Sequence, residues 1–264
     1  MARIVAVTNQ KGGVGKTTTC VNLAASLAAT KRQVLLVDMD PQGNATMGSG
    51  LDKNQLRVSG FDVLTRRYDA AEVCTEAPDS GFSVLPANGD LTAAEVELMN
   101  EIGREHRLKL ALKPLREAYD YVLIDCPPAL NLLTVNALAA ADTVLIPMQC
   151  EYYALEGLAA LMSTIEQIQE TVNPELAIEG ILRTMYDPRN SLTLDVSRQL
   201  SDYFGDKVYS AVIPRNVRLA EAPSYGMPAL RYDRASKGAI SYLALAGEMV
   251  RRNESQNKAG AVAV

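Results

Sequence analysis

The chain has 264 residues, of which 48% are hydrophobic, 22% are charged and 5% are aromatic, and its formal net charge is −5. This is the composition of an ordinary globular protein with a largely aliphatic core. No apolar run is long enough to cross a bilayer and no N-terminal segment resembles a signal peptide, so we expect neither a membrane-spanning nor a secreted protein. The expected location is the cytoplasm.

Short β-branched segments alternate with helical patterns along the chain, which predicts an α/β fold with a mostly parallel, twisted sheet covered by helices on both faces. The segments expected to form strands are 4–8, 33–38, 82–85, 121–125, 143–147, 177–182 and 208–213. The segments expected to form helices are 16–29, 91–102, 108–118, 155–171 and 237–252. No internal repeat or long linker divides the chain. We therefore predict one domain over 1–252, followed by a disordered tail over 253–264, which lacks periodicity.

Three local signals refine this prediction. Thr92 and Glu95 predict a capping box at the start of segment 91–102. Pro114 predicts a break in segment 108–118, because proline cannot donate a helical hydrogen bond. The cysteines form no CxxC pair, so zinc and thioredoxin-like chemistry are unsupported and reduced, mostly buried thiols are expected. They are Cys20, Cys74, Cys126 and Cys150.

The segment KGGVGKTT, from Lys11 to Thr18, lies between the first predicted strand and the first predicted helix. Its glycines let backbone N–H groups turn toward phosphate oxygens, and the helix N-terminus adds positive potential. Lys16 is expected to reach the β- and γ-phosphates of a nucleotide, and the Thr17 hydroxyl to bind Mg²⁺. The match is loose at its front, where Gln10 replaces the first glycine of the usual motif. The predicted phosphate-binding residues are Gly12, Gly13, Val14, Gly15, Lys16, Thr17 and Thr18.

Carboxylates follow two of the predicted strands. Asp38 and Asp40 lie at the end of segment 33–38, and Asp125 ends segment 121–125. Ligands of open α/β sheets bind outside the carboxyl ends of the strands, so all three acids should point toward the phosphates. Because Mg²⁺ keeps several waters, Asp125 is expected to contact it through water, and Asp40 is placed where it could position an attacking water.

Four segments together resemble the ParA/Soj family of chromosome-partitioning ATPases: KGGVGKTT, VDMDPQGNAT, YDYVLIDCPPAL and VIPRNVRLAEAPSYG. The likeness covers nearly the whole chain, residues 2–249. The last segment separates the partition branch from relatives such as MinD and the nitrogenase iron protein. The resemblance implies a P-loop NTPase with a deviant Walker A loop, ATP and Mg²⁺ as cofactors, and Mg²⁺-dependent hydrolysis of ATP to ADP and phosphate.

The resemblance also assigns roles to individual residues. Lys11 would reach the nucleotide of a second subunit when two ATP-bound chains close face to face, and would act there as an arginine finger does. Gly12 would lie at the seam of that homodimer. Pro214 and Asn216 would hold the adenine, and Asp38 and Asp125 would lie near the metal. The implied catalytic residues are Lys11, Lys16 and Asp40.

Charge is distributed unevenly along the chain. Residues 1–182 carry 14 Lys and Arg against 23 Asp and Glu, a balance of −9, whereas residues 183–264 carry 12 against 8, a balance of +4. Such asymmetry indicates a surface for a polyanion. The candidates are Arg183, Arg189, Arg215, Arg218, Arg231, Arg234 and Lys237.

The resemblance aligns Arg189 and Arg218 with DNA-binding arginines of Soj-like proteins. No helix-turn-helix is evident, so double-stranded DNA would be bound through its phosphates, without sequence specificity. The resemblance further implies a ParB-type centromere-binding partner, whose basic N-terminal tail stimulates hydrolysis and releases the dimer from DNA.

Three other functions make different demands on the sequence. A MinD-like membrane switch needs a C-terminal amphipathic helix, and NESQNKAGAVAV has one lysine and only small apolar residues. An iron–sulfur protein resembling the nitrogenase iron protein needs two suitably placed cysteines, and only Cys126 and Cys150 are candidates. The third alternative is a nucleotide-binding adaptor that does not hydrolyse ATP. Asp40→Ala discriminates it from an ATPase, in which ATP turnover should fall while ATP-dependent dimerisation and DNA binding persist.

Overall fold

The computed structural model describes the backbone of residues 1–262 and the side chains of residues 1–255. In this part of the chain, eight strands form one sheet in the order β3-β4-β2-β5-β1-β6-β7-β8. All neighbouring strands are parallel except β3 and β4. The strands are β1 (Arg3–Val7), β2 (Val34–Asp38), β3 (Thr75–Glu76), β4 (Ser83–Leu85), β5 (Tyr121–Asp125), β6 (Thr143–Gln149), β7 (Ala177–Tyr186) and β8 (Val208–Pro214).

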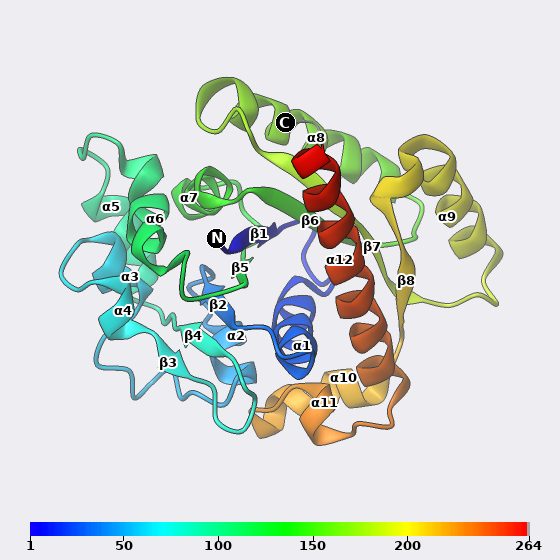
Figure 1. The fold of residues 1–264 in the computed structure, drawn as a ribbon, viewed down its shortest axis with the longest axis horizontal. Helices are drawn as coiled ribbons and strands as arrows, with labels where there is room; N and C mark the ends of the chain where they lie inside the picture. The colour runs from blue at the N-terminus through cyan, green and yellow to red at the C-terminus, as the bar shows by residue number, and fades with distance from the viewer. Residues whose placement is uncertain (263–264) are drawn as a thin grey trace.

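Helices connect the strands and cover the sheet (Figure 1). The α-helices are α1 (Lys16–Ala29), α2 (Asn44–Gly48), α3 (Gly60–Leu64), α4 (Ala70–Val73), α5 (Leu91–Glu97), α6 (Arg107–Leu112), α7 (Leu132–Ala140), α8 (Ala154–Thr171), α9 (Ser191–Phe204), α10 (Val217–Glu221), α11 (Ala229–Tyr232) and α12 (Lys237–Val262). The 3₁₀ helices are Arg104–His106, Lys113–Leu115, Gly205–Lys207 and Ala222–Tyr225. The predicted fold class is thereby confirmed.

The sheet is buried on both faces because its strands are apolar on both. Ile4 and Ala6 of β1 join a core with α3, α5, α6, α7 and α8, whereas Val5 and Val7 join a second core with α1 and α12. Successive strand residues point to opposite faces, so a continuous apolar strand feeds both cores. Figure 1 shows α1 beside α12, with α10 and α11 along the lower edge. No helix of the described residues is long and apolar enough to span a membrane.

Some local predictions differ from the structure. The break at Pro114 is confirmed, since a 3₁₀ turn, Lys113–Leu115, follows α6. The capping box is wrong: α5 begins at Leu91, and Asp90 at its N-cap makes no side-chain cap. Glu95 instead accepts a hydrogen bond from Asn131, a contact that local sequence could not indicate.

The C-terminal helix is longer than the sequence pattern indicated. It continues to Val262, past Arg252, into the segment expected to be disordered. That segment contains no proline, and its alanine, lysine, glutamine and glutamate residues are compatible with a helix. Positions 263–264 lie outside the described residues, and the domain boundary at residue 252 stays a prediction.

Candidate nucleotide-binding site

The phosphate loop joins β1 to α1 and is fixed by the strands beside it. Gly13 and Gly15 have φ angles of 73° and 90°, in the left-handed region that favours glycine. Thr184 of β7 donates from Oγ1 to the Val14 carbonyl over 2.8 Å, and Asn9 donates from Nδ2 to a carbonyl of β6 over 2.9 Å. The loop therefore presents its backbone in one conformation at the start of a helix, as phosphate binding requires.

Lys16 begins α1 and is almost fully buried, with 8% of its surface exposed. Its Nζ donates to the Lys11 carbonyl over 3.2 Å, so the side chain lies back along the loop. Burial lowers the pKa of Lys16, and the negative charge of Asp125 partly offsets that effect. A buried ammonium group beside a glycine-rich loop and the N-terminus of a helix is a favourable environment for phosphate oxygens.

Asp38 and Asp125 lie side by side at the carboxyl edge of the sheet, because they are register partners on the adjacent strands β2 and β5. Thr46 donates to the Asp38 carboxylate from its backbone N over 2.8 Å and from its hydroxyl over 2.7 Å. Burial raises the pKa of Asp38 to about 6 and that of Asp125 to about 8, and the charge of Asp38 adds to the rise at Asp125.

The residues at the carboxyl edge of the sheet fit a magnesium ion that takes only a few ligands from the protein and the others from phosphate and water. Asp125 Oδ2 is buried and has no hydrogen-bond partner among the described residues. The Thr17 side chain lies close enough to lower the pKa of Asp125 by hydrogen bonding. No group of three or more His, Cys, Asp or Glu residues in the described part of the chain could hold a metal by itself. Mg²⁺ binding would therefore depend on phosphate oxygens and water, as is usual for this ion.

Asp125 should make the stability of the nucleotide-free protein depend on pH. Its folded-state pKa, about 8, lies above the ordinary 3.8, so the folded chain keeps a proton that the unfolded chain loses. The resulting stability is complete below pH 3.8 and is lost as the pH rises through about 8. The melting temperature of Asp125→Asn should therefore fall less between pH 6 and 8 than that of the wild type, by about 2–4 °C for each kcal/mol retained.

Differential scanning fluorimetry in EDTA would measure this difference in melting temperature. Asp52→Asn is a suitable control because Asp52 is exposed and lies outside the acid pair. An equal fall in wild type and Asp125→Asn would contradict the prediction.

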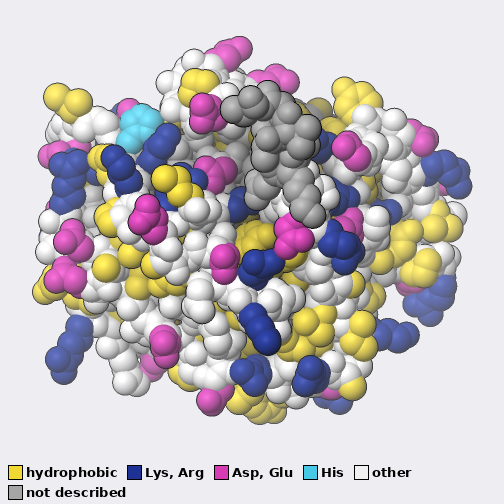
Figure 2. Space-filling model, viewed as in Figure 1, with side chains coloured by type: hydrophobic (Ala, Val, Ile, Leu, Met, Phe, Trp, Pro, Cys, Tyr) yellow, Lys and Arg dark blue, Asp and Glu magenta, His cyan; other side chains and the backbone are white. Residues whose placement is uncertain are grey.

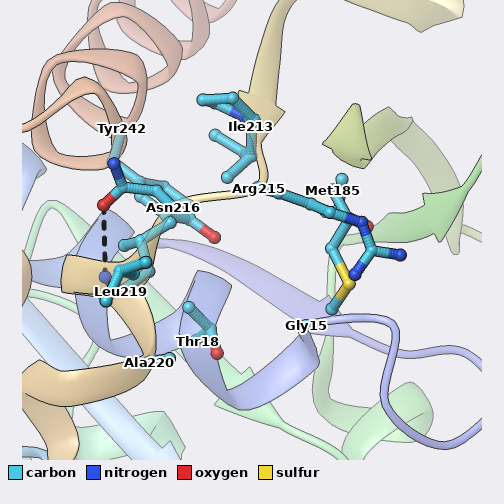
Figure 3. A pocket seen from close by; sticks show the side chains of 12 residues that line it. Gly15, Thr18, Met185, Ile213, Arg215, Asn216, Leu219, Ala220 and Tyr242 are labelled. Atoms are coloured by element: carbon cyan, nitrogen blue, oxygen red, sulfur yellow. Dashed lines mark hydrogen bonds between the residues drawn. The ribbon is translucent and has the colours of Figure 1, made fainter. Parts of the chain in front are cut away.

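A pocket of about 430 Å³ opens beside the phosphate loop, between the ends of β7 and β8 and helix α10. Pro214 ends β8, and Asn216 caps α10 by accepting a hydrogen bond from Leu219 N over 3.3 Å. Figure 3 shows Thr18 of α1 at the base of the pocket, Asn216 on one wall and Met185 on the opposite wall. The mostly apolar lining and the volume suit a planar base whose phosphates extend into the loop.

The front of the loop faces solvent. Lys11 Nζ forms an ion pair with Glu151 Oε2 at 2.7 Å, and 47% and 46% of the two side chains are exposed. A Cβ atom on Gly12 would meet no atom within 4 Å, and its φ is not positive, so nothing inside the chain requires glycine there. Glu151 was not among the predicted site residues. Asp38 was predicted because it ends a strand at the carboxyl edge of the sheet. The same argument would have indicated Glu151 if the strand predicted over 143–147 had been extended to Gln149, where β6 ends.

The two arginines aligned with DNA-binding residues lie on the surface. Arg189, in the loop before α9, pairs with Asp187 at 2.8 Å, and Arg218 of α10 pairs with Glu221 at 2.7 Å. Figure 2 shows Lys and Arg side chains along the lower and right-hand rim, over the region that holds α9 to α11 in Figure 1. Because exposed ion pairs contribute little, these arginines can exchange their partners for phosphates.

Arg183 does not belong to this surface, which corrects the list of candidates. Its Nη1 donates to Ser197 Oγ over 2.7 Å, and its Nη2 donates to the Tyr209 carbonyl over 2.7 Å. The guanidinium group therefore links β7 to α9 and β8 and is engaged inside the protein.

The cysteines are reduced, and three of the four are buried, as predicted. Cys126 and Cys150 have 1% and 5% of their surface exposed, and burial raises the pKa of Cys150 to about 11. A cluster shared between two subunits needs thiolates at the surface, so these thiols are poorly placed for an iron–sulfur centre.

The family model described as an AAA domain matches residues 2–178. The chain is 52% identical to the sporulation initiation inhibitor Soj of Bacillus subtilis, over 94% of this chain and 98% of that protein. It is 51% identical to the chromosome partitioning protein ParA of Myxococcus xanthus, over 96% of this chain and 89% of that protein.

Solved structures share the fold. A Mycobacterium smegmatis structure, described as cobyrinic acid a,c-diamide synthase with bound ADP and magnesium, is 40% identical over 97% of both chains, with a TM-score of 0.85. The septum site-determining protein MinD of Pyrococcus horikoshii, complexed with Mg-ADP, is 27% identical over 94% of this chain and 96% of that chain, with a TM-score of 0.78. The two partitioning proteins are 51% and 52% identical to this chain, whereas these two solved structures are 40% and 27% identical, so the partitioning proteins assign the family. The chain therefore belongs to the ParA/Soj family of chromosome-partitioning P-loop ATPases.

Proposed function

We propose that this chain is an ATP-dependent dimerising switch for chromosome or plasmid segregation. It binds DNA without sequence specificity as an ATP dimer, and it leaves DNA when a ParB-type partner stimulates hydrolysis. The observation that carries the proposal is the front of the phosphate loop, where Lys11 and Gly12 face solvent beside the nucleotide site.

Nucleotide binding uses the loop and the pocket together. Lys16 and the backbone N–H groups of the loop hold the β- and γ-phosphates, and Pro214 and Asn216 hold the adenine. Thr17 would ligate a bound Mg²⁺, with Asp38 and Asp125 nearby, and the ion would neutralise charge on the phosphates. Asp40 is only partly buried and lies on the loop after β2, with Oδ1 accepting from Gln42 N over 2.9 Å. From there its carboxylate can orient the attacking water.

Dimerisation would bring Lys11 to the nucleotide of the partner. The ion pair with Glu151 contributes only about 0–1 kcal/mol because it is exposed, so Lys11 can leave it at little cost. The space around Gly12 is open in the single chain, which is compatible with a close approach by a second chain there. A γ-phosphate held between two chains would make dimerisation depend on the state of the nucleotide.

The DNA-bound form would follow from dimerisation. A dimer doubles the basic surface around Arg189 and Arg218, and two linked weak contacts bind a polyanion far more tightly than one. The protein would then be cytoplasmic and associated with the nucleoid.

Arg218→Glu should abolish gel shifts of double-stranded DNA at moderate salt while leaving ATP-dependent dimerisation intact. The substitution replaces a phosphate-binding cation by an anion twice in each dimer, and losing two phosphate contacts reduces the salt slope of binding by about 2. Arg57→Glu makes the same change in charge at an exposed position of the acidic part and should leave DNA binding intact. Retained shifts by Arg218→Glu would contradict the assignment of this surface.

The proposal as a whole is tested by measuring DNA binding and oligomeric state with ATP, with ADP and without nucleotide. DNA binding and a dimer should appear together, and only with ATP. A monomer that binds ATP tightly without dimerising would overturn the switch. Co-sedimentation with liposomes in ATP would instead favour the MinD-like membrane function.

A further inference from the structure

A set of apolar side chains is exposed at the end of α5 and in the turn that follows it. Val96, Met99 and Ile102 have 70%, 58% and 98% of their surface exposed. They recur at every third position along the helix and turn. On the buried side of the same helix, Leu91 and Ala94 anchor α5 in the core. Leu98, directly after the helix, is also buried, so α5 and the start of the turn are held against the core.

The segment that carries this surface is acidic on balance. Residues 59–113 contain ten Asp and Glu against six Lys and Arg. Glu97 and Glu101 alternate with the apolar residues and pair with Arg67 at 3.0 Å and with Arg107 at 2.5 Å. About half of each glutamate side chain remains exposed, so its oxygens can accept further hydrogen bonds. An apolar strip between carboxylates complements a basic segment that is apolar on one side.

Helix α5 is connected to both loops that carry the candidate acids. In the loop before α5, Ala87 N donates to Thr46 Oγ1 over 2.9 Å, and the same hydroxyl donates to Asp38 over 2.7 Å. On α5 itself, Glu95 accepts a hydrogen bond from Asn131, which caps α7. The loop that contains Asn131 starts at the end of β5, where Asp125 lies. A displacement of α5 would therefore reach both sides of the acid pair.

We propose that the surface formed by Val96, Glu97, Met99, Glu101 and Ile102, the α5 surface, binds a basic amphipathic segment of the partner protein and transmits that contact to the hydrolysis site. The inference rests on the proposed function for the existence of a stimulating partner. It adds the place of contact and the route, which runs through Thr46 and Asn131. Glu95 is a positioning residue in this scheme, because it acts through Asn131 and does not contact the nucleotide.

The test uses a fluorescein-labelled peptide with the basic N-terminal tail of a ParB-type protein, and the full ATPase with ATP and DNA. The triple variant Val96→Ser/Met99→Ser/Ile102→Ser should bind the peptide at least about tenfold more weakly by anisotropy and lose stimulation, with basal ATP turnover unchanged. The matched control, Leu194→Ser/Tyr203→Ser/Ile240→Ser, removes three exposed apolar side chains from α9 and α12. Because α9 borders the proposed DNA surface, this control is read in peptide binding without DNA, where it should bind as wild type does.

Glu95→Ala separates binding from transmission, since it should bind the peptide as wild type does but show reduced stimulation. Wild-type binding and stimulation in the triple variant would overturn the α5 surface while leaving the proposed function in place. A wild-type protein that neither binds the peptide nor responds to the intact partner would overturn both the surface and the partner step. DNA binding and oligomeric state, measured with ATP, with ADP and without nucleotide, would still test ATP-dependent dimerisation and DNA binding.

Discussion

Lys11→Ala is expected to reduce ATP turnover by at least about 10³-fold, the magnitude typical of a cation supplied in trans during phosphoryl transfer. The Lys11 side chain is about half exposed and pairs only with Glu151 among the described contacts, so its removal should not disturb folding. ATP binding should persist, because Lys16 and the backbone of the loop remain. Phosphate release at saturating ATP and binding of a fluorescent ATP analogue would measure the two effects.

Glu151→Gln is the matched control for Lys11→Ala. If Lys11 acted within its own chain, held there by Glu151, both variants should lose turnover to a similar extent. If Lys11 acts on the nucleotide of a second chain, Glu151→Gln removes only an exposed ion pair worth about 0–1 kcal/mol and should change turnover by less than about fivefold. Equal losses in the two variants would contradict the proposed role of Lys11.

Asp40→Ala is expected to reduce turnover by about 10²–10⁴-fold while ATP-dependent dimerisation and DNA binding persist. Asp40 does not hold the phosphates, and its carboxylate makes one local contact, with Gln42 N. Its loss should therefore remove the positioning of water and leave the ATP-bound form trapped as a dimer. Analytical ultracentrifugation with ATP, alongside phosphate release, separates these outcomes. Wild-type turnover in Asp40→Ala would favour a different hydrolysis residue.

A mixture of the two inactive variants tests exchange between chains directly. In a heterodimer of Lys11→Ala and Asp40→Ala, one nucleotide has both its own Asp40 and the Lys11 of the partner subunit. Random pairing of equal amounts gives half heterodimers with one working site each, so turnover should recover to about a quarter of wild type. No recovery is expected if both residues serve only their own chain.

The sheet was largely predictable because its strands are strongly apolar. The segment from Tyr121 to Asp125 was predicted with its observed bounds, and α1 likewise, because glycine and lysine signals mark its start. The two-residue strand β3 was missed, since an exposed Thr75–Glu76 pair carries no apolar pattern. The start of α5 at residue 91 was predicted, but the capping box of Thr92 and Glu95 was wrong, because Asp90 occupies the N-cap and makes no side-chain cap.

The position of the phosphate loop was predicted from the sequence alone. Its glycines, Lys16 and Thr17 lie within one short segment of chain, so their order along the chain specifies the geometry they can adopt. Asp38 and Asp125 were likewise predictable at one edge of the sheet, because each directly ends a buried parallel strand. The resemblance to the ParA/Soj family then supplied the interpretation of Lys11.

Contacts between distant parts of the chain were decided only by the tertiary structure. The order β2-β5-β1-β6 makes Asp38 a register partner of Asp125, and the end of β6 places Glu151 against Lys11. The contact of Glu95 with Asn131 likewise depends on how α5 packs beside α7. No local pattern encodes such pairs, because strand order and helix packing are set by burial of the whole apolar surface at once.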